Sequence, residues 1–200
     1  MAKTSDQNST LANQIDVPCT SHAAAPPAAV SMSAPRAEPW CGDFDIRIAR
    51  DGTWLYRDSP IGRMALVKLF ASVLRRESDG AYWLVTPFER GRIRVDDAPF
   101  TAVELTVEGA GQEQALVFRT NLDEFVTAGP DHPIRVSTAC PGGGPRPYLL
   151  ARPGLEALIV RPVYYQLIEL GVEGVWHGES RLGVWSRGEF FVLGRLEEEA

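Results

Sequence analysis

The sequence contains few of the residues that metal sites and disulfide frameworks require. Only three cysteines and three histidines occur among its 200 residues. Cys19, Cys41 and Cys140 stand far apart with no CxxC pair, and the histidines are equally scattered, whereas a zinc site needs clustered thiolates or imidazoles. We therefore expect free thiols in a reducing compartment, with no metal and no other cofactor.

Long apolar runs and an excess of basic residues are also missing. No stretch approaches the ~20 apolar residues that span a bilayer, and the N-terminus lacks the continuous apolar segment of a signal peptide. The formal net charge is −6, so no basic face is expected for a nucleic-acid backbone. These absences predict a cytoplasmic protein with no membrane span and no nucleic-acid partner. A small phosphate-bearing ligand is still compatible with the composition, because two or three arginines suffice to bind one.

The motifs of common enzyme classes are absent as well. The chain has no Gly-x-Ser-x-Gly nucleophile elbow. The glycine-rich loop at 141–145 lacks the Lys-Ser/Thr and the helix of a phosphate-binding loop, and is typical of a flexible hairpin. Asp131 and His132 could form an acid–base pair, but the flanking glycine and prolines favour a turn. Asp96 and Asp97 are predicted to be solvated loop carboxylates. The sequence thus assigns no reaction, and we lean towards a protein that is not an enzyme.

Residues 1–39 differ in composition from the rest of the chain. They contain no aromatic residue and consist mainly of Ala, Ser, Thr and Pro. Such a segment buries too little apolar surface to offset a backbone entropy cost of ~1–2 kcal/mol per residue. We expect a disordered tail over 1–39, an N-terminal β-β-α-β subdomain over 40–87, and a β-rich C-terminal subdomain with one helix over 88–200.

Apolar residues at a spacing of two predict that most ordered elements are strands. Strands are expected at 44–48, 53–56, 82–85, 92–95, 103–107, 115–120, 125–127 and 133–136, with a closing hairpin formed by 183–185 and 190–193. Ser59-Pro60 is typical of a helix start, and the spacing of apolar residues from Leu66 to Leu74 predicts a helix. Short connections after residue 81 indicate an antiparallel meander. The expected fold class is α+β, mostly antiparallel β with two helices.

The last third of the chain repeats landmarks of the first. Tyr148 stands six residues before Gly154, as Tyr56 stands six before Gly62, and a helix-like pattern follows each glycine. Short units of this kind need a neighbour to bury their apolar faces, so we expect an internal duplication in which the two halves pack together. The second helix-like pattern contains a proline, which predicts a kink near Arg161.

Arginine and tyrosine recur near these landmarks. If the two halves pack face to face, the side chains that converge on the interface are Tyr56, Arg63, Arg146, Tyr148 and Arg161. Guanidinium forks and aromatic faces together suit a planar anion such as a nucleotide. Asp131 and His132 complete the expected ligand-binding set. In the alternative interpretation, each arginine simply pairs with a surface carboxylate.

Several strings of the sequence are similar to those of a known bacterial family. They are Gly-Asp-Phe-Asp-Ile-Arg-Ile-Ala-Arg-Asp-Gly-Thr-Trp at 42–54, Pro-Ile-Gly-Arg at 60–63, Leu-Val-Thr-Pro at 84–87, Ala-Gly-Pro-Asp-His-Pro at 128–133 and Pro-Arg-Pro-Tyr at 145–148. In this order they resemble the family catalogued as domain of unknown function 1285. The resemblance implies a duplicated core, a C-terminal half similar to pleckstrin-homology-type barrels, and a nucleotide-like ligand between the halves with a role in signalling. The triple glycine at 142–144 and residues 88–91 depart from the family pattern. These departures change the loops around the ligand site that the resemblance implies between the halves.

The leading hypothesis is therefore a non-catalytic ligand-binding or signalling module with its site between the two halves. It rests on the missing catalytic motifs and on the recurring arginines and tyrosines. One alternative is an enzyme whose acid–base residues come from separate strands, with Asp131 and His132 as the first suspects. The other is a scaffold that holds a protein partner.

Overall fold

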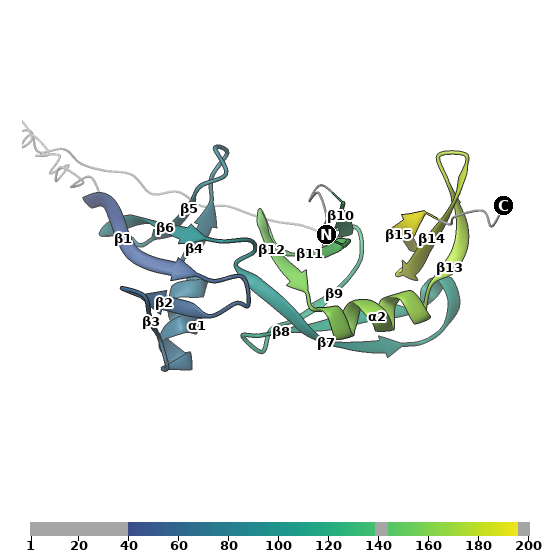
Figure 1. Cartoon of the computed structure of the whole chain (residues 1–200), viewed down its shortest axis with the longest axis horizontal. Coiled ribbons are helices and arrows are strands. Elements are labelled where there is room, and N and C mark those ends of the chain that lie inside the picture. Colours follow the sequence, from purple (N-terminus) through teal and green to yellow (C-terminus); the bar gives the residue numbers. More distant parts are fainter. Residues whose placement is uncertain (1–39, 139–143, 196–200) are drawn as a thin grey trace, which may run out of the picture. The chain divides into compact units, whose positions relative to one another are not determined.

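The structure is a computed structural model that describes residues 40–138 and 144–195 (Figure 1). All of these residues belong to one structural unit. The tail predicted over 1–39 and most of the glycine-rich loop lie outside the described residues.

The first half of the chain forms a six-stranded sheet with strand order β3-β2-β1-β6-β5-β4. Its strands are β1 (Trp40–Ile48), β2 (Trp54–Tyr56), β3 (Ser59–Pro60), β4 (Leu74–Arg76), β5 (Tyr82–Val85) and β6 (Glu89–Val95). Helix α1 (Met64–Ser72) connects β3 to β4. Neighbouring strands are antiparallel except for the central pair, β1 and β6, which is parallel. Alternation along β1 buries Ile46 and Ile48 on the face that packs in the core.

The second half repeats this strand succession in another six-stranded sheet, ordered β10-β11-β12-β7-β8-β9. Its strands are β7 (Phe100–Glu108), β8 (Ala115–Thr120), β9 (Phe125–Thr127), β10 (Ile134–Ser137), β11 (Arg146–Arg152) and β12 (Leu155–Ile159), with a 3-10 turn at Gly111–Glu113. Its central pair, β7 and β12, is again parallel. In both sheets the first and sixth strands of the repeat lie side by side, so the predicted duplication is confirmed in the architecture.

A stacked arginine–tyrosine pair shows which residues of the two repeats correspond. In the first repeat Arg76 of β4 pairs with Tyr82 of β5, and its guanidinium lies 5.5 Å from the ring centroid. In the second, Arg135 of β10 pairs with Tyr148 of β11, at 4.3 Å. Tyr148 therefore corresponds to Tyr82, and matching it with Tyr56 is wrong.

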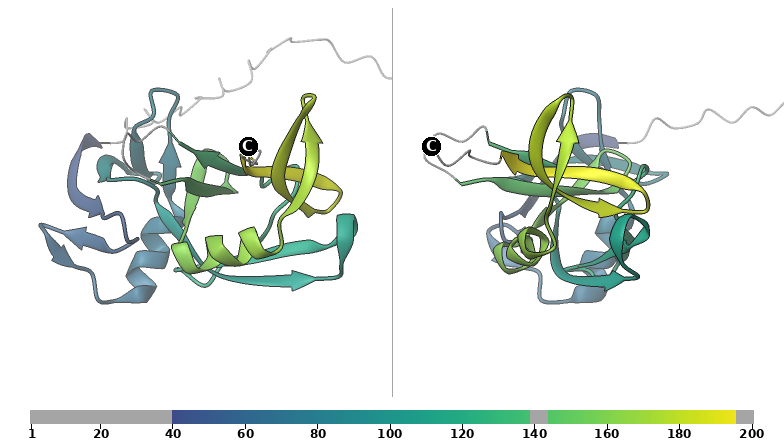
Figure 2. Two further views of the ribbon diagram at one scale, coloured as in Figure 1. Left: turned by 45° about the vertical axis from the view of Figure 1, so that its right-hand side comes forward. Right: turned by 90° about the vertical axis from the view of Figure 1, so that its right-hand side faces the viewer.

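Helix α2 (Arg161–Glu169) follows the second repeat and leads to an antiparallel sheet of β13 (Val172–Trp176), β14 (Glu179–Ser186) and β15 (Glu189–Arg195). Figures 1 and 2 show α2 running beside β7, with which it is in contact. The Tyr164 hydroxyl donates a hydrogen bond to the Leu193 carbonyl at 3.2 Å. The structure contains a curled half-barrel sheet, in agreement with the predicted likeness to a pleckstrin-homology-type barrel. Helix α2 and the third sheet contact strands of the second sheet.

A fully buried serine ties the third sheet to the second. The Ser186 hydroxyl donates to the Ala128 carbonyl at 2.8 Å and accepts a hydrogen bond from the Leu116 amide at 3.0 Å. Its side chain is 0% exposed. A buried backbone amide needs a partner, because leaving it unpaired costs its full desolvation energy.

We expect Ser186→Ala to lower the free energy of unfolding by about 1–3 kcal/mol, since it leaves the Leu116 amide without an acceptor. Urea unfolding measures this difference. Ser180→Ala on the same strand is the control, because Ser180 is exposed and should change stability by less than about 0.5 kcal/mol. Equal stability of the two variants would show that the Ser186 bonds do not hold the two sheets together.

The predicted start of the first helix is wrong. Ser59-Pro60 is a short strand, because the chain turns back at Arg57 and Asp58 and keeps pairing with β2, where the Ile61 amide donates to the Trp54 carbonyl at 2.8 Å. Helix α1 begins only at Met64. Its buried residues are Val67 and Ala71, whereas Leu69 is 60% exposed and Leu74 belongs to β4.

The predicted second helix and its kink are also corrected. Residues 155–159 form β12, in which every second residue is buried and which pairs with β11 and β7. Helix α2 starts at Arg161, so Pro162 lies in the first turn, where its missing amide interrupts no hydrogen bond. The expected kink is therefore absent at Pro162.

Most predicted strands are confirmed, including those at 82–85, 115–120 and 125–127, whose bounds match β5, β8 and β9. The meander prediction holds for β7–β9 and for β10–β12, but β12 pairs in parallel with β7. The first sheet ends at Val95 and the second begins at Phe100. This change of sheet lies later than the predicted boundary between residues 87 and 88.

Candidate functional site

A pocket of about 440 Å³ lies where β11 begins and β12 ends, beside the start of α2. Its charged lining residues are Arg50, Asp97, Arg146 and Arg161. Arg50 follows β1 and Asp97 follows β6, so the first repeat contributes one wall; the second repeat and α2 contribute the rest. We call this cavity the junction pocket.

Asp97 is the centre of a hydrogen-bonded group in the wall of the junction pocket. Its side chain is only 9% exposed. The Tyr148 hydroxyl donates to Oδ1 at 2.7 Å, and Arg146 Nη1 donates to Oδ2 at 3.1 Å. Arg50 Nε lies 3.7 Å from Oδ2. Burial, together with the hydrogen bond to Asp97, raises the pKa of Tyr148, so the phenol stays protonated and acts as a donor near neutral pH.

The prediction that Asp96 and Asp97 are both solvated loop carboxylates is wrong for Asp97. Asp96 fits it better: its side chain is 30% exposed and it forms a two-pronged ion pair with Arg47, at 2.9 and 2.7 Å. The hydrogen bonds from Arg47 lower the pKa of Asp96. Neighbouring carboxylates therefore serve different roles, and only Asp97 faces the junction pocket.

Arg161 supplies an exposed positive charge at the opening of α2. Within residues 40–138 and 144–195 it has no carboxylate within ion-pair distance. Val160 caps the helix without a side-chain hydrogen bond, so the first amides of α2 are not satisfied by a cap. Three guanidiniums and one carboxylate make the lining net positive in a chain whose total charge is −6.

The equivalent place in the first repeat holds a pocket of different charge. Ile93 pairs with Tyr82, and Leu158 pairs with the corresponding Tyr148, so Ile93 and Leu158 are equivalent. Asp96 and Arg161 each follow by three residues and are therefore equivalent as well. A pocket of about 690 Å³ lies there, and its charged lining residues are Asp43, Asp45, Arg92, Arg94 and Asp96. Carboxylates outnumber guanidiniums in it, so of these two equivalent pockets only the junction pocket has a net positive lining.

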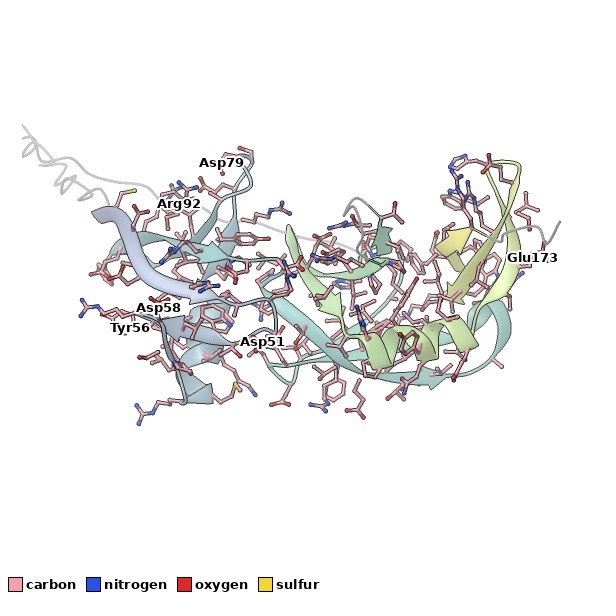
Figure 3. All side chains as sticks on the ribbon, in the orientation of Figure 1. Asp51, Tyr56, Asp58, Asp79, Arg92 and Glu173 are labelled. Carbon is pink, nitrogen blue, oxygen red and sulfur yellow. The ribbon has the colours of Figure 1, made fainter. Side chains whose placement is uncertain are left out.

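The structure brings together three of the residues that the sequence selected. Arg146 and Arg161 line the junction pocket, and Tyr148 supports its wall through Asp97. Tyr56 lies elsewhere, on β2 of the first sheet (Figure 3). It is half-exposed, it contacts the Arg57 guanidinium, and it lines a separate pocket of the first repeat.

The remaining predicted residues also lie outside the junction pocket. Arg63 is an exposed residue at the start of α1. Asp131 and His132 occupy the predicted turn, in which Gly129 and His132 form a β-bridge. His132 Nδ1 is 2.8 Å from the Leu150 carbonyl, a contact that fixes the ring to the backbone. Asp131 is exposed.

Sequence reasoning missed Arg50, Asp97 and Tyr165, which all line the junction pocket. In the parallel central pair, Ile48 of β1 lies opposite Val95 of β6. Arg50 and Asp97 follow these two residues by the same interval, so they emerge at the same edge of the sheet. Recognising from the sequence that these two strands pair would place Arg50 and Asp97 together, whereas no local motif does so.

The described residues contain neither a cluster of metal-binding side chains nor a helix that could cross a membrane. Across 40–138 and 144–195, no three His, Cys, Asp or Glu side chains are grouped so that they could hold a metal ion. In the same ranges neither helix has the length and apolar character needed to cross a bilayer.

Family models match both halves of the chain. The model described as "Domain of unknown function (DUF1285), N-terminal domain" covers residues 34–98, and "Protein of unknown function (DUF1285), C-terminal domain" covers 99–193. The chain belongs to the DUF1285 family. The resemblance found in the sequence is thus confirmed, and the two DUF1285 models meet in the segment between β6 and β7. No functionally curated protein matches this chain.

Two solved structures of DUF1285 proteins resemble this one. The protein from Silicibacter pomeroyi DSS-3 is 46% identical, with a TM-score of 0.72 over 82% of this chain and 88% of the other. The protein from Shewanella baltica OS155 is 23% identical, with a TM-score of 0.49 over 62% of this chain and 91% of the other. The first of these supports the DUF1285 fold described above.

Proposed function

We propose that this protein is a ligand-binding module that takes a nucleotide-like anion in the junction pocket and acts in signalling. The observation that carries the proposal is the group of three guanidiniums, from Arg50, Arg146 and Arg161, around one pocket. Guanidiniums form charge-assisted, often bidentate hydrogen bonds with phosphate, and such bonds are stronger than neutral ones. The volume of about 440 Å³ lies within the roughly 300–1,000 Å³ usual for small-molecule sites.

The aromatic lining fits the planar part of such a ligand. Tyr165 lines the junction pocket and is 61% exposed, so its ring face is accessible. Large aromatic faces offer apolar contact area to a planar group at low conformational cost. Tyr164, by contrast, is buried and bonded to Leu193, so it serves as fixed wall. Arg50 and Arg161 would hold the anionic group and Tyr165 the ring.

The position of the pocket supports a role in signalling. Arg50 belongs to the first repeat and Arg161 to the helix that follows the second. An anion held by both would stabilise the arrangement in which the two repeats meet, because binding favours the state that presents both groups. Ligand binding would then raise the population of this arrangement of the two repeats. A partner protein can detect such a shift.

A thermal-shift titration of the full chain with AMP, using adenosine as the phosphate-free control, tests the proposal. At 100 times its dissociation constant AMP should stabilise the protein by about 2.7 kcal/mol, whereas adenosine should have a much smaller effect. Arg161→Ala should weaken AMP binding by about tenfold or more, since it removes one charge-assisted contact.

Arg63→Ala is the matched control, because Arg63 is also an exposed arginine at a helix start but lies outside the junction pocket. It should leave AMP binding unchanged. Equal weakening by the two substitutions would indicate non-specific charge attraction. Absence of stabilisation by AMP and by a panel of other nucleotides would contradict the proposal.

A further inference from the structure

We infer that the ligand carries hydroxyl groups next to its anionic group, as in a polyol or sugar phosphate, and that Asp97 selects it by accepting a hydrogen bond from them. The inference rests on the proposed function and deepens it. It starts from an unusual feature: a pocket lined by three guanidiniums also contains a carboxylate, and that carboxylate is nine-tenths buried.

The Asp97 carboxylate has acceptor capacity that hydrogen bonds within residues 40–138 and 144–195 do not use. Two carboxylate oxygens offer about four lone-pair sites. Hydrogen bonds from Tyr148, at 2.7 Å, and from Arg146, at 3.1 Å, occupy two of them. Arg50 Nε, at 3.7 Å, is within ion-pair distance but beyond hydrogen-bond distance. Because Asp97 lines the junction pocket, a ligand donor can use the remaining capacity.

Tyr148 and Arg146 also hold the carboxylate in place, which makes it a selective acceptor. Both belong to β11, whose pairing with β10 and β12 fixes their backbone. A positioned, charged acceptor favours a hydroxyl donor more than a mobile one does, because no ordering cost arises on binding. Its negative charge also repels an anion that brings no donor. The hydrogen bond and the charge repulsion therefore both favour a hydroxylated anion over an anion without hydroxyl groups.

The arginines and Asp97 together define the chemical class of the ligand. Arg50 and Arg161 attract the phosphate, whereas Asp97 disfavours a phosphate without neighbouring hydroxyls. The corresponding pocket of the first repeat has Asp96 where Arg161 stands and lacks this combination. Of these two pockets, only the junction pocket is thus expected to select a hydroxylated phosphate.

Two small phosphates of equal charge and equal carbon chain test the inference. Glycerol 3-phosphate and n-propyl phosphate differ only by two hydroxyl groups, and isothermal titration calorimetry of the full chain measures both affinities. We expect glycerol 3-phosphate to bind about tenfold more tightly or better, the effect of one hydrogen bond to a charged group. In Asp97→Asn the ratio should fall below about threefold, chiefly because n-propyl phosphate binds more tightly.

Asp96→Asn is the matched control, because it removes the neighbouring carboxylate, which pairs with Arg47 outside the junction pocket. It should keep the tenfold ratio. If Asp97→Asn fails to fold, Asp97→Glu is the second variant: it retains a charge for Arg146 but displaces the carboxylate, and should also reduce the ratio.

The outcomes separate this inference from the proposed function. If both phosphates bind wild-type protein equally, hydroxyl selection is overturned while anion binding stands. If the ratio is high but unchanged in the Asp97 variants, Asp97 is not the selecting residue. If neither phosphate nor AMP binds, the proposed function fails and the inference with it.

Discussion

Replacing Arg146 with methionine is expected to lower the free energy of unfolding by roughly 3 kcal/mol and to weaken AMP binding by about tenfold or more, since it removes one of the three guanidiniums of the junction pocket. The substitution leaves the carboxylate of Asp97, which is 9% exposed, with a single hydrogen bond from Tyr148. Breaking a buried ion pair by removing one partner costs about 3–5 kcal/mol. The lower end applies here, because the Arg146 side chain is 29% exposed and Arg50 lies within 3.7 Å of the carboxylate. Urea unfolding and calorimetry with AMP measure the two effects.

A double variant shows whether the lost stability of Arg146→Met comes from the buried Asp97 charge that is left without its partner. Arg146→Met combined with Asp97→Asn should regain part of the lost stability, because no buried charge is left without its partner. Arg119→Met is the surface control: its ion pairs, with Glu104 and Asp123, involve exposed carboxylates, so their loss should change stability much less than the loss of Arg146 does. A loss below 1 kcal/mol in Arg146→Met would show that Asp97 is satisfied without it.

Phe118→Ala is expected to destabilise the protein by about 3–5 kcal/mol, the range for deleting a buried phenyl ring and leaving a cavity. Phe118 is 0% exposed on β8 and faces the core of the second repeat. Phe125 on the adjacent strand β9 is 69% exposed. Phe125→Ala should therefore change stability by less than about 0.5 kcal/mol. Urea unfolding of both variants measures the difference, and a similar loss from each would contradict the assigned faces of the sheet.

Local signals predicted the strands well and the helix ends poorly. The alternation of apolar residues at 115–120 is a property of the segment itself, and it gave the bounds of β8. The start of α1 was wrong because Ser59-Pro60 is equally compatible with a cap and with an edge strand. Its pairing with β2, a non-local contact, decides between them.

The duplication was predicted from the wrong landmarks. Tyr56 and Tyr148 share a spacing to a glycine, but they lie on strands that do not correspond. A better signal is the pattern Tyr-x-Leu-x-x-Pro, which occurs at 82–87 and at 148–153. It covers β5 and β11, which do correspond. The parallel pairs β1–β6 and β7–β12 close each repeat, and neither can be recognised from local periodicity, because their partners are far apart in the sequence.

The site was predictable only in part. Arg146 and Arg161 were selected because each stands beside a landmark of the second half, and both line the junction pocket. Arg50 and Asp97 follow strands whose parallel pairing brings them to one edge. Asp97 is buried because Tyr148 and Arg146 reach it from a strand about 50 positions away along the chain. These contacts are non-local, so from local sequence alone a loop carboxylate such as Asp97 is predicted to be solvated.

A crystal structure of the full chain with AMP bound tests the central claim most directly. The account predicts the AMP phosphate in the junction pocket, within hydrogen-bond distance of Arg161 and of Arg50 or Arg146. AMP bound in the pocket of the first repeat that contains Asp96, or at the surface around Arg63, would contradict it.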